Sequence, residues 1–171
     1  MIVEAIVEIP KGSYYKYEID KKTGELVLDR VVNYPVPFNY GYVVDTLSED
    51  GDPLDVFILS SDPIPPKTRV KVKLHSVFLC KDNGDLDHKL IGTIEGDIHA
   101  VTTLDEVSIK YYLENYKRGF TVNSHEQLNK AVGTTWAAQK AYLLAYSSKV
   151  RRKSTKSLEQ SLIDAKKKQG W

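Results

Sequence analysis

Hydrophobic and polar residues alternate over much of the first half of the chain, which is typical of strands with one buried face. Val70, Val72 and Leu74, for example, are separated by Lys71 and Lys73. Segments of this kind predict strands at residues 2–9, 14–19, 26–31, 56–59, 70–79 and 90–94, and the Lys-Thr-Gly run at 22–24 indicates a hairpin turn. The chain is therefore expected to begin with a β-rich region whose strands are joined by polar loops.

The pattern changes to a helical one after Thr103. Val107 and Tyr111 lie about one turn apart in a glycine-free stretch that ends before Gly119. This stretch predicts a first helix. Strands followed by helices indicate an α+β, mainly β fold, a small barrel or strongly curved sheet with helices packed outside it.

A second helix is predicted further along the chain. Leu128, Val132 and Trp136 recur at a spacing of four, and either Asn123 or Ser124 can cap the start.

The composition is that of an ordinary globular protein. Of 171 residues, 42% are hydrophobic and 27% charged, and no apolar run is long enough to cross a bilayer. Glu4 and Glu8 interrupt the apolar start, so a secretory signal is not expected. Cys80 is the single cysteine, which excludes an internal disulfide and suits a reducing cytoplasm.

Charge divides the chain into two parts. The net charge is +1, but residues 149–171 hold eight basic and two acidic residues and carry +6, which leaves −5 for residues 1–148. An acidic body argues against nucleic-acid binding and favours divalent cations. We therefore expect one domain over residues 1–148 and a basic tail over 149–171. The tail is predicted as a surface helix, with membrane or partner binding as an alternative.

The densest chemical signal is the acidic run at residues 50–55. Asp50, Asp52 and Asp55 are separated by a glycine and a proline that impose a tight turn, so their oxygens can converge on one hard cation such as magnesium or calcium. An EF-hand loop is excluded, because its sixth position requires glycine and is Asp55. Taken alone, the run is better interpreted as a solvated acidic turn.

Other charged residues complete a mixture that phosphate chemistry needs. A second acidic turn spans residues 82–89, and acids alternate with a lysine on the first two predicted strands. Each alone would be a loop or a solvated face. Together they supply acids to hold metals, cations to neutralise the migrating charge and a carboxylate to accept a proton. The members outside the run at 50–55 are Glu8, Lys16, Glu18, Arg30, Asp82, Asp87, Lys89, Tyr116 and Lys117.

Six segments in a fixed order resemble the soluble family I inorganic pyrophosphatases, and the resemblance runs from about residue 3 to about residue 117. They are residues 8–10 with 16–20, then 28–30, 39–42, 50–56, 82–89 and 116–117. The resemblance implies an OB-like five-stranded β-barrel flanked by helices that hydrolyses pyrophosphate to two phosphates. The short chain resembles the bacterial homohexamers, with a dimer or trimer as alternatives.

The resemblance also implies a set of metal ligands. Asp50, Asp55 and Asp87 would hold the tightest ion, and Asp55 would reach a second. Asp82 and Asp87 would bring in another ion with the substrate, and Glu18 would hold one more, with Glu8 nearby through water. About three to four Mg²⁺ ions would bridge the phosphates, with Mn²⁺ or Co²⁺ as alternatives.

By the same resemblance, Asp52 is the general base that takes a proton from a water shared by two ions. Tyr40 would hydrogen-bond in the neighbourhood of Asp52, although a core aromatic in a turn is nearly as good an interpretation. The substrate clamp would comprise Lys16, Arg30, Tyr116 and Lys117, with Lys89 beside the metals bound by Asp82 and Asp87.

One segment departs from the family pattern. Residues 31–38 are two residues shorter than the usual spacing, and a substrate-side tyrosine of the family falls on Val36. Tyr34 is the candidate to replace its hydroxyl. Two other functions stay open: a barrel that binds metal or nucleic acid without catalysis, and a hydrolase acting on short polyphosphate or a nucleotide.

Overall fold

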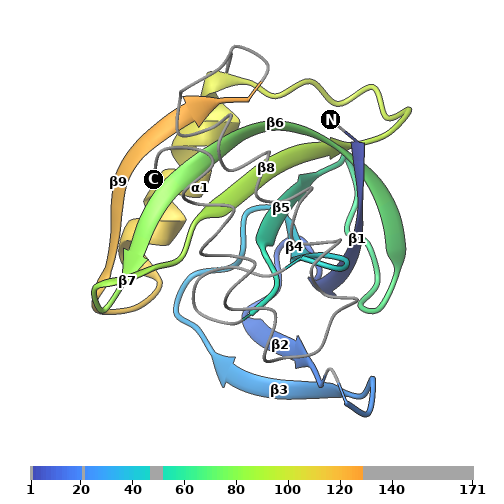
Figure 1. Cartoon of the computed structure of the whole chain (residues 1–171), viewed down its shortest axis with the longest axis horizontal. Coiled ribbons are helices and arrows are strands. Elements are labelled where there is room, and N and C mark those ends of the chain that lie inside the picture. Colours follow the sequence, from blue (N-terminus) through green and yellow to red (C-terminus); the bar gives the residue numbers. More distant parts are fainter. Residues whose placement is uncertain (1, 21, 47–51, 129–171) are drawn as a thin grey trace, which may run out of the picture.

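Five strands close into a β-barrel. The computed structural model describes residues 2–20, 22–46 and 52–128. In order around the barrel, the strands are β1 (Ile2–Ile9), β4 (Asn39–Val43), β5 (Asp55–Leu59), β8 (Lys89–Ile94) and β6 (Arg69–Asp82). The long strand β6 arches over the molecule and pairs back with β1 (Figure 1). The β5–β8 pair is parallel and the other pairs are antiparallel. This confirms the mainly β, OB-like barrel that the sequence predicts.

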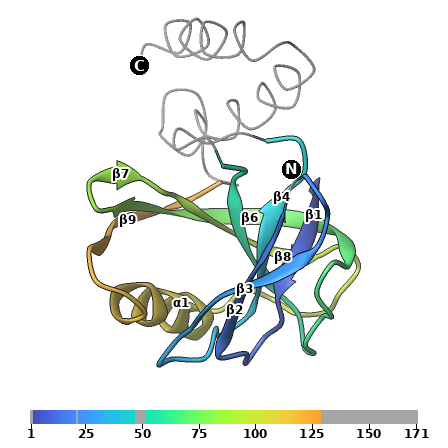
Figure 2. The same ribbon diagram turned by 90° about the horizontal axis from the view of Figure 1, so that it is seen from below.

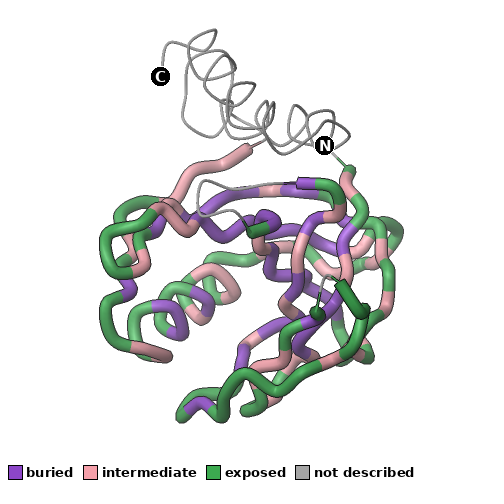
Figure 3. Tube along the Cα trace, turned by 60° about the horizontal axis from the view of Figure 1, so that its bottom comes forward, coloured by how far each residue is buried: buried purple, intermediate pink, exposed green. Residues whose placement is uncertain are grey.

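The barrel is filled by the apolar residues of its alternating strands. Val72 and Leu74 are buried while Lys71 and Lys73 are exposed, as their alternation predicts. Figure 3 shows buried positions following the barrel strands and exposed positions along the outer hairpin. The cluster consists of Ala5, Val7, Val43, Leu54, Val56, Ile58, Val72, Leu74, Val77 and Leu90. Glycine is required at position 41, where β4 pairs closely with β1, because a Cβ there would overlap the carbonyl of Ile6.

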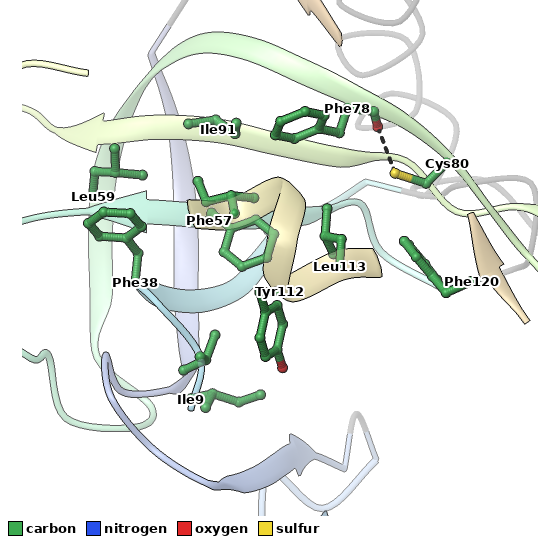
Figure 4. Close-up of a cluster of buried hydrophobic side chains, with 12 residues drawn as sticks. Ile9, Phe38, Phe57, Leu59, Phe78, Cys80, Ile91, Tyr112, Leu113 and Phe120 are labelled. Atoms are coloured by element: carbon green, nitrogen blue, oxygen red, sulfur yellow. Dashed lines mark hydrogen bonds between the residues drawn. The ribbon is translucent and has the colours of Figure 1, made fainter. Parts of the chain in front are cut away.

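A second apolar cluster joins the barrel to helix α1 (Thr103–Asn115). Phe57 packs edge-on against Tyr112, with ring centroids 6.2 Å apart, and Leu113 lies alongside (Figure 4). The helix starts with a capping box, in which the Thr102 hydroxyl accepts from the Asp105 amide and the Asp105 carboxylate accepts from the Thr102 amide. The predicted first helix is thus confirmed, and its buried stripe fixes it against the barrel.

The strands β2 (Tyr15–Ile19) and β3 (Leu26–Val31) form a separate hairpin at one end of the barrel (Figures 1 and 2). Gly24 turns the chain at a φ of 73°, a value that glycine adopts without strain. A β-bulge follows Lys16. The buried carboxylate of Glu8 accepts a 2.8 Å hydrogen bond from the Ile19 amide, which ties the hairpin to β1.

Three strands were not predicted from the sequence: β4, the two-residue β7 (Asp85–Leu86) and β9 (Phe120–Gln127). The prediction that Asn123 or Ser124 caps a second helix is wrong, because both lie in β9, which pairs with β6 from Ser76 to Asp82. Strand β1 pairs with β6 only from Arg69 to Lys73, and β8 lies on the opposite edge, so the rest of the β1 edge of β6 is open to β9. Backbone pairing along this edge outweighs the local helical spacing.

The rest of the predicted second helix, with Val132 and Trp136, lies outside the described residues, as does the basic tail at 149–171. Within the described ranges α1 is the single helix, and no helix there is long and apolar enough to cross a membrane.

Candidate active site

One cavity of about 590 Å³ gathers the charged residues that the sequence singles out. It lies between the β2–β3 hairpin and the barrel, and its walls also include residues that follow α1. Every predicted site residue within the described ranges lines it; Asp50 lies outside those ranges. These residues are Glu8, Lys16, Glu18, Arg30, Tyr40, Asp52, Asp55, Asp82, Asp87, Lys89, Tyr116 and Lys117.

Lys89 forms the charged centre of the cavity. Its Nζ donates to Oδ2 of Asp55 at 2.6 Å, to Oδ1 of Asp87 at 2.9 Å and to the hydroxyl of Tyr40 at 2.8 Å. The side chain is only 3% exposed. The parallel register of β5 and β8, which pairs Asp55 with Lys89, brings these groups together from distant parts of the chain. Removing one partner of a buried ion pair destabilises a protein by about 3–5 kcal/mol. The folded state therefore depends on keeping Lys89 together with its carboxylate partners.

The surroundings of Lys89 keep it charged. Burial alone would lower the pKa of its ammonium, but the nearby charges, led by Asp55 and including Asp87, outweigh burial and raise that pKa well above its usual value. Burial and the charge of Asp55 raise the pKa of Tyr40 well above its usual value. Tyr40 therefore stays a neutral phenol that accepts from Lys89. It also packs edge-on against Phe57, so it serves both the core and the site.

A second ion pair lies where β6 meets the segment after α1. Nζ of Lys117 is 2.6 Å from Oδ2 of Asp82. The ammonium also lies over the ring of Tyr116, 5.4 Å from its centroid. Burial raises the pKa of Tyr116, so its hydroxyl is a hydrogen-bond donor at neutral pH. This wall of the cavity therefore offers a cation and a phenol beside a carboxylate.

The hairpin supplies the opposite wall. Lys16 and Arg30 face each other in the β2–β3 register, and Asp29 lies between them, with its Oδ2 3.6 Å from Nζ of Lys16 and 3.3 Å from Nε of Arg30. Burial and the positive charges of Lys89 and Lys117 lower the pKa of Lys16, while Asp29 opposes this shift. Several cations thus converge on one cavity, which favours a multiply charged anion.

Asp52 and Asp55 enter the cavity from the acidic run. Asp52 is exposed, whereas Pro53 and Leu54 are buried and anchor the run to the barrel. The Leu54 amide donates to the hydroxyl of Thr46, which in turn donates to the carbonyl of Val43. The side of the run that the structure describes is therefore held firmly at the start of β5.

Tyr34 is the sequence's candidate to replace the family tyrosine that falls on Val36, but neither residue lines the cavity. Val36 is 1% exposed and belongs to the apolar cluster under α1. Tyr34 packs edge-on against Tyr111, with ring centroids 6.0 Å apart. The shorter segment has therefore become part of the core and of the α1 surface.

Sequence reasoning missed several lining residues, notably Tyr17, Asp29 and Tyr42. Asp29 was visible as part of a motif, but its contact with two cations depends on the bulge in the hairpin, which no spacing rule predicts. Tyr17 and Tyr42 lie inside the recognised motifs at 16–20 and 39–42, so the motifs already marked the segments that carry them.

Comparison with known proteins identifies the family. The family model for inorganic pyrophosphatase matches residues 5–147. The chain belongs to the inorganic pyrophosphatase family. The match extends beyond Lys117, where the resemblance was expected to fade. The structure, however, shows β9 rather than the expected helical start in that region.

Individual pyrophosphatases agree with this assignment. The chain is 38% identical over 129 residues to the inorganic pyrophosphatase of Nanoarchaeum equitans, covering 68% of this chain and 79% of the relative. It is 38% identical over 136 residues to soluble inorganic pyrophosphatase 2 of Chlamydomonas reinhardtii, covering 74% and 69%. The crystal structure of the inorganic pyrophosphatase from Thermus thermophilus superposes with a TM-score of 0.76 at 29% identity, covering 86% of this chain and 91% of that one.

The donors in the cavity of this pyrophosphatase suit a hard divalent cation. Two carboxylate oxygens, from Asp55 and Asp87, already converge on a single positive charge. Within the described ranges no three His, Cys, Asp or Glu side chains come close enough together to form a metal site. Asp50, the third ligand that the resemblance implies, belongs to the undescribed part of the acidic run. The described residues thus supply two converging carboxylates of the type that a hard cation prefers, and the implied ligand set includes one residue beyond them.

Proposed function

We propose that this chain hydrolyses inorganic pyrophosphate to two orthophosphates with the help of Mg²⁺. The observation that carries the proposal is the meeting, in one cavity, of four cations with several carboxylates from distant segments. The cations are Lys16, Arg30, Lys89 and Lys117. Pyrophosphate carries several negative charges at its two ends, so a cavity with cations on opposite walls suits it. The relatives and the Thermus neighbour are themselves named inorganic pyrophosphatases.

The proposed metal ligands follow from the resemblance and are supported by their common place in the cavity. Asp55 and Asp87, together with Asp50, would hold the tightest ion. Asp82 with Asp87, and Glu18 with Glu8, would serve further ions, to a total of about three to four with substrate. Mg²⁺ is the preferred ion, with Mn²⁺ or Co²⁺ as alternatives. When bound, such ions lower the pKa of water and neutralise phosphate charge.

The remaining residues bind substrate and move the proton. Lys16, Arg30, Tyr116 and Lys117 donate hydrogen bonds to phosphate oxygens and hold the leaving phosphate in position. Asp52 accepts the proton of the attacking water, a role supported by its place in the cavity and its exposed carboxylate. Tyr40 keeps Lys89 beside Asp55 and Asp87.

We also propose that the chain works as a homohexamer in the cytoplasm. Leu104, Val107 and Tyr111 lie on one face of α1 and are all exposed, as expected of a surface that another subunit covers. The single cysteine suits a reducing compartment. Sedimentation of the purified chain tests the assembly, and a monomer at micromolar concentration contradicts it.

The decisive experiment is to measure phosphate release from pyrophosphate with Mg²⁺, with an EDTA control. ATP and tripolyphosphate are tested as competing substrates. We expect release from pyrophosphate that EDTA abolishes and little from the other two. Preferential hydrolysis of tripolyphosphate or ATP would assign another substrate to the same chemistry. No release from any of them would favour a binding module.

A further inference from the structure

Lys89 lies where two predicted metal ligands meet. Its ammonium donates to both Asp55 and Asp87, and the side chain is almost completely enclosed. Asp55 begins β5 and Asp87 comes two residues before Lys89, so the β5–β8 register fixes all three groups relative to one another. The contact is therefore built into the barrel and does not depend on a mobile surface side chain.

We propose that Lys89 is an internal counter-cation that competes with the divalent metal for Asp55 and Asp87. The inference rests on the metal site assigned under the proposed function. In the metal-free protein, Lys89 neutralises the two carboxylates and holds the site in shape. For the metal to bind through the two oxygens that Lys89 contacts, the ammonium must give up both contacts.

The competition follows from the geometry of the contacts. The ammonium nitrogen lies 2.6 Å from one carboxylate oxygen and 2.9 Å from the other. Mg²⁺ binds oxygen ligands at about 2.0–2.1 Å and keeps a near-octahedral shell, so it cannot share these oxygens with a donating ammonium on the same side. A charge-assisted hydrogen bond is also stronger than a neutral one. Metal binding must therefore offset the loss of two such bonds.

Tyr40 offers the displaced ammonium a hydrogen-bond acceptor inside the cavity. Its hydroxyl is 2.8 Å from Nζ of Lys89 and is part of a side chain packed against Phe57. A lysine has three donors on a flexible stem, so Lys89 can keep the bond to Tyr40 while it leaves the carboxylates. It then stays in the cavity as a cation available to a phosphate oxygen.

Two measurable properties should move in opposite directions when Lys89 loses its charge. The metal-free protein should become less stable, because Asp55 and Asp87 repel each other without a shared cation. Metal affinity should rise, because the competitor has been removed. A residue that only filled space would not produce this opposite pair of effects.

The test compares Lys89→Met with Lys16→Met, using Mg²⁺ or Mn²⁺ alone and no substrate. Both variants remove one positive charge from the same cavity, but Lys16 forms its ion pair with Asp29 rather than with a predicted metal ligand. Titration calorimetry should show that Lys89→Met binds metal about tenfold or more tightly than wild type, while Lys16→Met changes affinity by about threefold or less. In EDTA, Tm should fall clearly for Lys89→Met, and saturating Mg²⁺ should restore it.

Unchanged or weaker metal affinity in Lys89→Met would overturn the inference, as would equal tightening in both variants. If Lys89→Met does not fold in EDTA, the Mn²⁺-loaded protein is titrated with EDTA, and the proposal then requires a higher chelator concentration than wild type needs. The outcome is separate from that of the proposed reaction. If the wild-type chain releases no phosphate, while Lys89→Met still binds metal more tightly than wild type, only the proposed reaction is refuted.

Discussion

Lys117 and Asp82 are 35 positions apart in the chain, yet Nζ of one lies 2.6 Å from Oδ2 of the other. The pair joins a predicted substrate-binding cation to a predicted metal ligand. It thus couples the segment after α1 to the end of β6, two parts that must be assembled before substrate can be held.

Replacing Lys117 with methionine should raise the KM for pyrophosphate about tenfold or more, because the phosphate loses a charge-assisted hydrogen bond. The KM should also become less sensitive to ionic strength. Steady-state kinetics at two salt concentrations measure both effects. Lys81→Met is the matched control, since Lys81 is exposed and does not line the cavity. A similar KM in the two variants would remove Lys117 from the substrate site.

Asp52→Asn should cut turnover by about a hundredfold or more while folding and metal affinity stay close to those of wild type. The amide has nearly the shape of the carboxylate but cannot accept the proton. Phosphate release measures turnover, and calorimetry with Mg²⁺ measures metal affinity. Asp45→Asn makes the same chemical change at a residue that does not line the cavity, so its turnover should stay near wild type. An active Asp52→Asn enzyme would show that another group accepts the proton.

Gly41→Ala should destabilise the fold by about 3 kcal/mol, because the new methyl group would overlap the Ile6 carbonyl and push β4 away from β1. Gly24→Ala is a suitable comparison. Nothing lies near the added group there, and only its positive φ causes strain, at a cost of about 1 kcal/mol. Urea denaturation gives both free energies of unfolding. Equal costs would contradict the close approach of the two strands.

The burial of His125 predicts that the stability of the fold depends on pH. Its ring stacks on Phe78, with centroids 4.3 Å apart, and burial lowers its pKa despite the neighbouring Glu106, whose Oε1 is 3.8 Å from Nε2. Because the folded-state pKa lies below that of the unfolded chain, protonation favours the unfolded state. Stability should therefore be fully present above about pH 6.5 and fall as the pH drops below that value.

His125→Phe removes this titrating group and keeps an aromatic ring beside Phe78. Between pH 7 and pH 5.5, its Tm should fall less steeply than that of wild type. His75 contributes in the same direction, since burial also lowers its pKa, so a residual slope is expected. Calorimetric melts at several pH values make the comparison. A variant slope as steep as that of wild type would assign the acid sensitivity to other groups.

The sequence predicted most of the barrel because its strands obey a local rule. Val72 and Leu74 alternate with exposed lysines, and such a pattern survives whatever tertiary structure surrounds it. Strand β4 carries Asn39 and Gly41, which are poor strand formers on local grounds. Asn39 is instead held by tertiary hydrogen bonds. In one of them, the Ile64 amide donates to Oδ1 of Asn39 at 2.8 Å. Such bonds cannot be read from spacing.

The predicted start of the second helix was wrong for a related reason. Asn123 and Ser124 are good helix caps, but the long edge of β6 offered a partner for backbone hydrogen bonds. The candidate site residues came from motifs, and those within the described ranges all line one cavity. What the motifs could not predict is the geometry: that Lys89 bonds to both Asp55 and Asp87, or that Tyr34 packs on α1.

The pairing of β1 with β6 has a consequence for how the protein reaches its native state. Ile2 pairs with Lys73 and Ala5 with Val70, so the last seam of the barrel joins residues far apart in sequence. The hairpin β2–β3 and helix α1 are local and can form early, whereas this seam requires the closure of a large loop. Closure of the barrel is therefore expected to limit the folding rate, and until it occurs the N-terminal strand has an unpaired edge exposed to association with other chains.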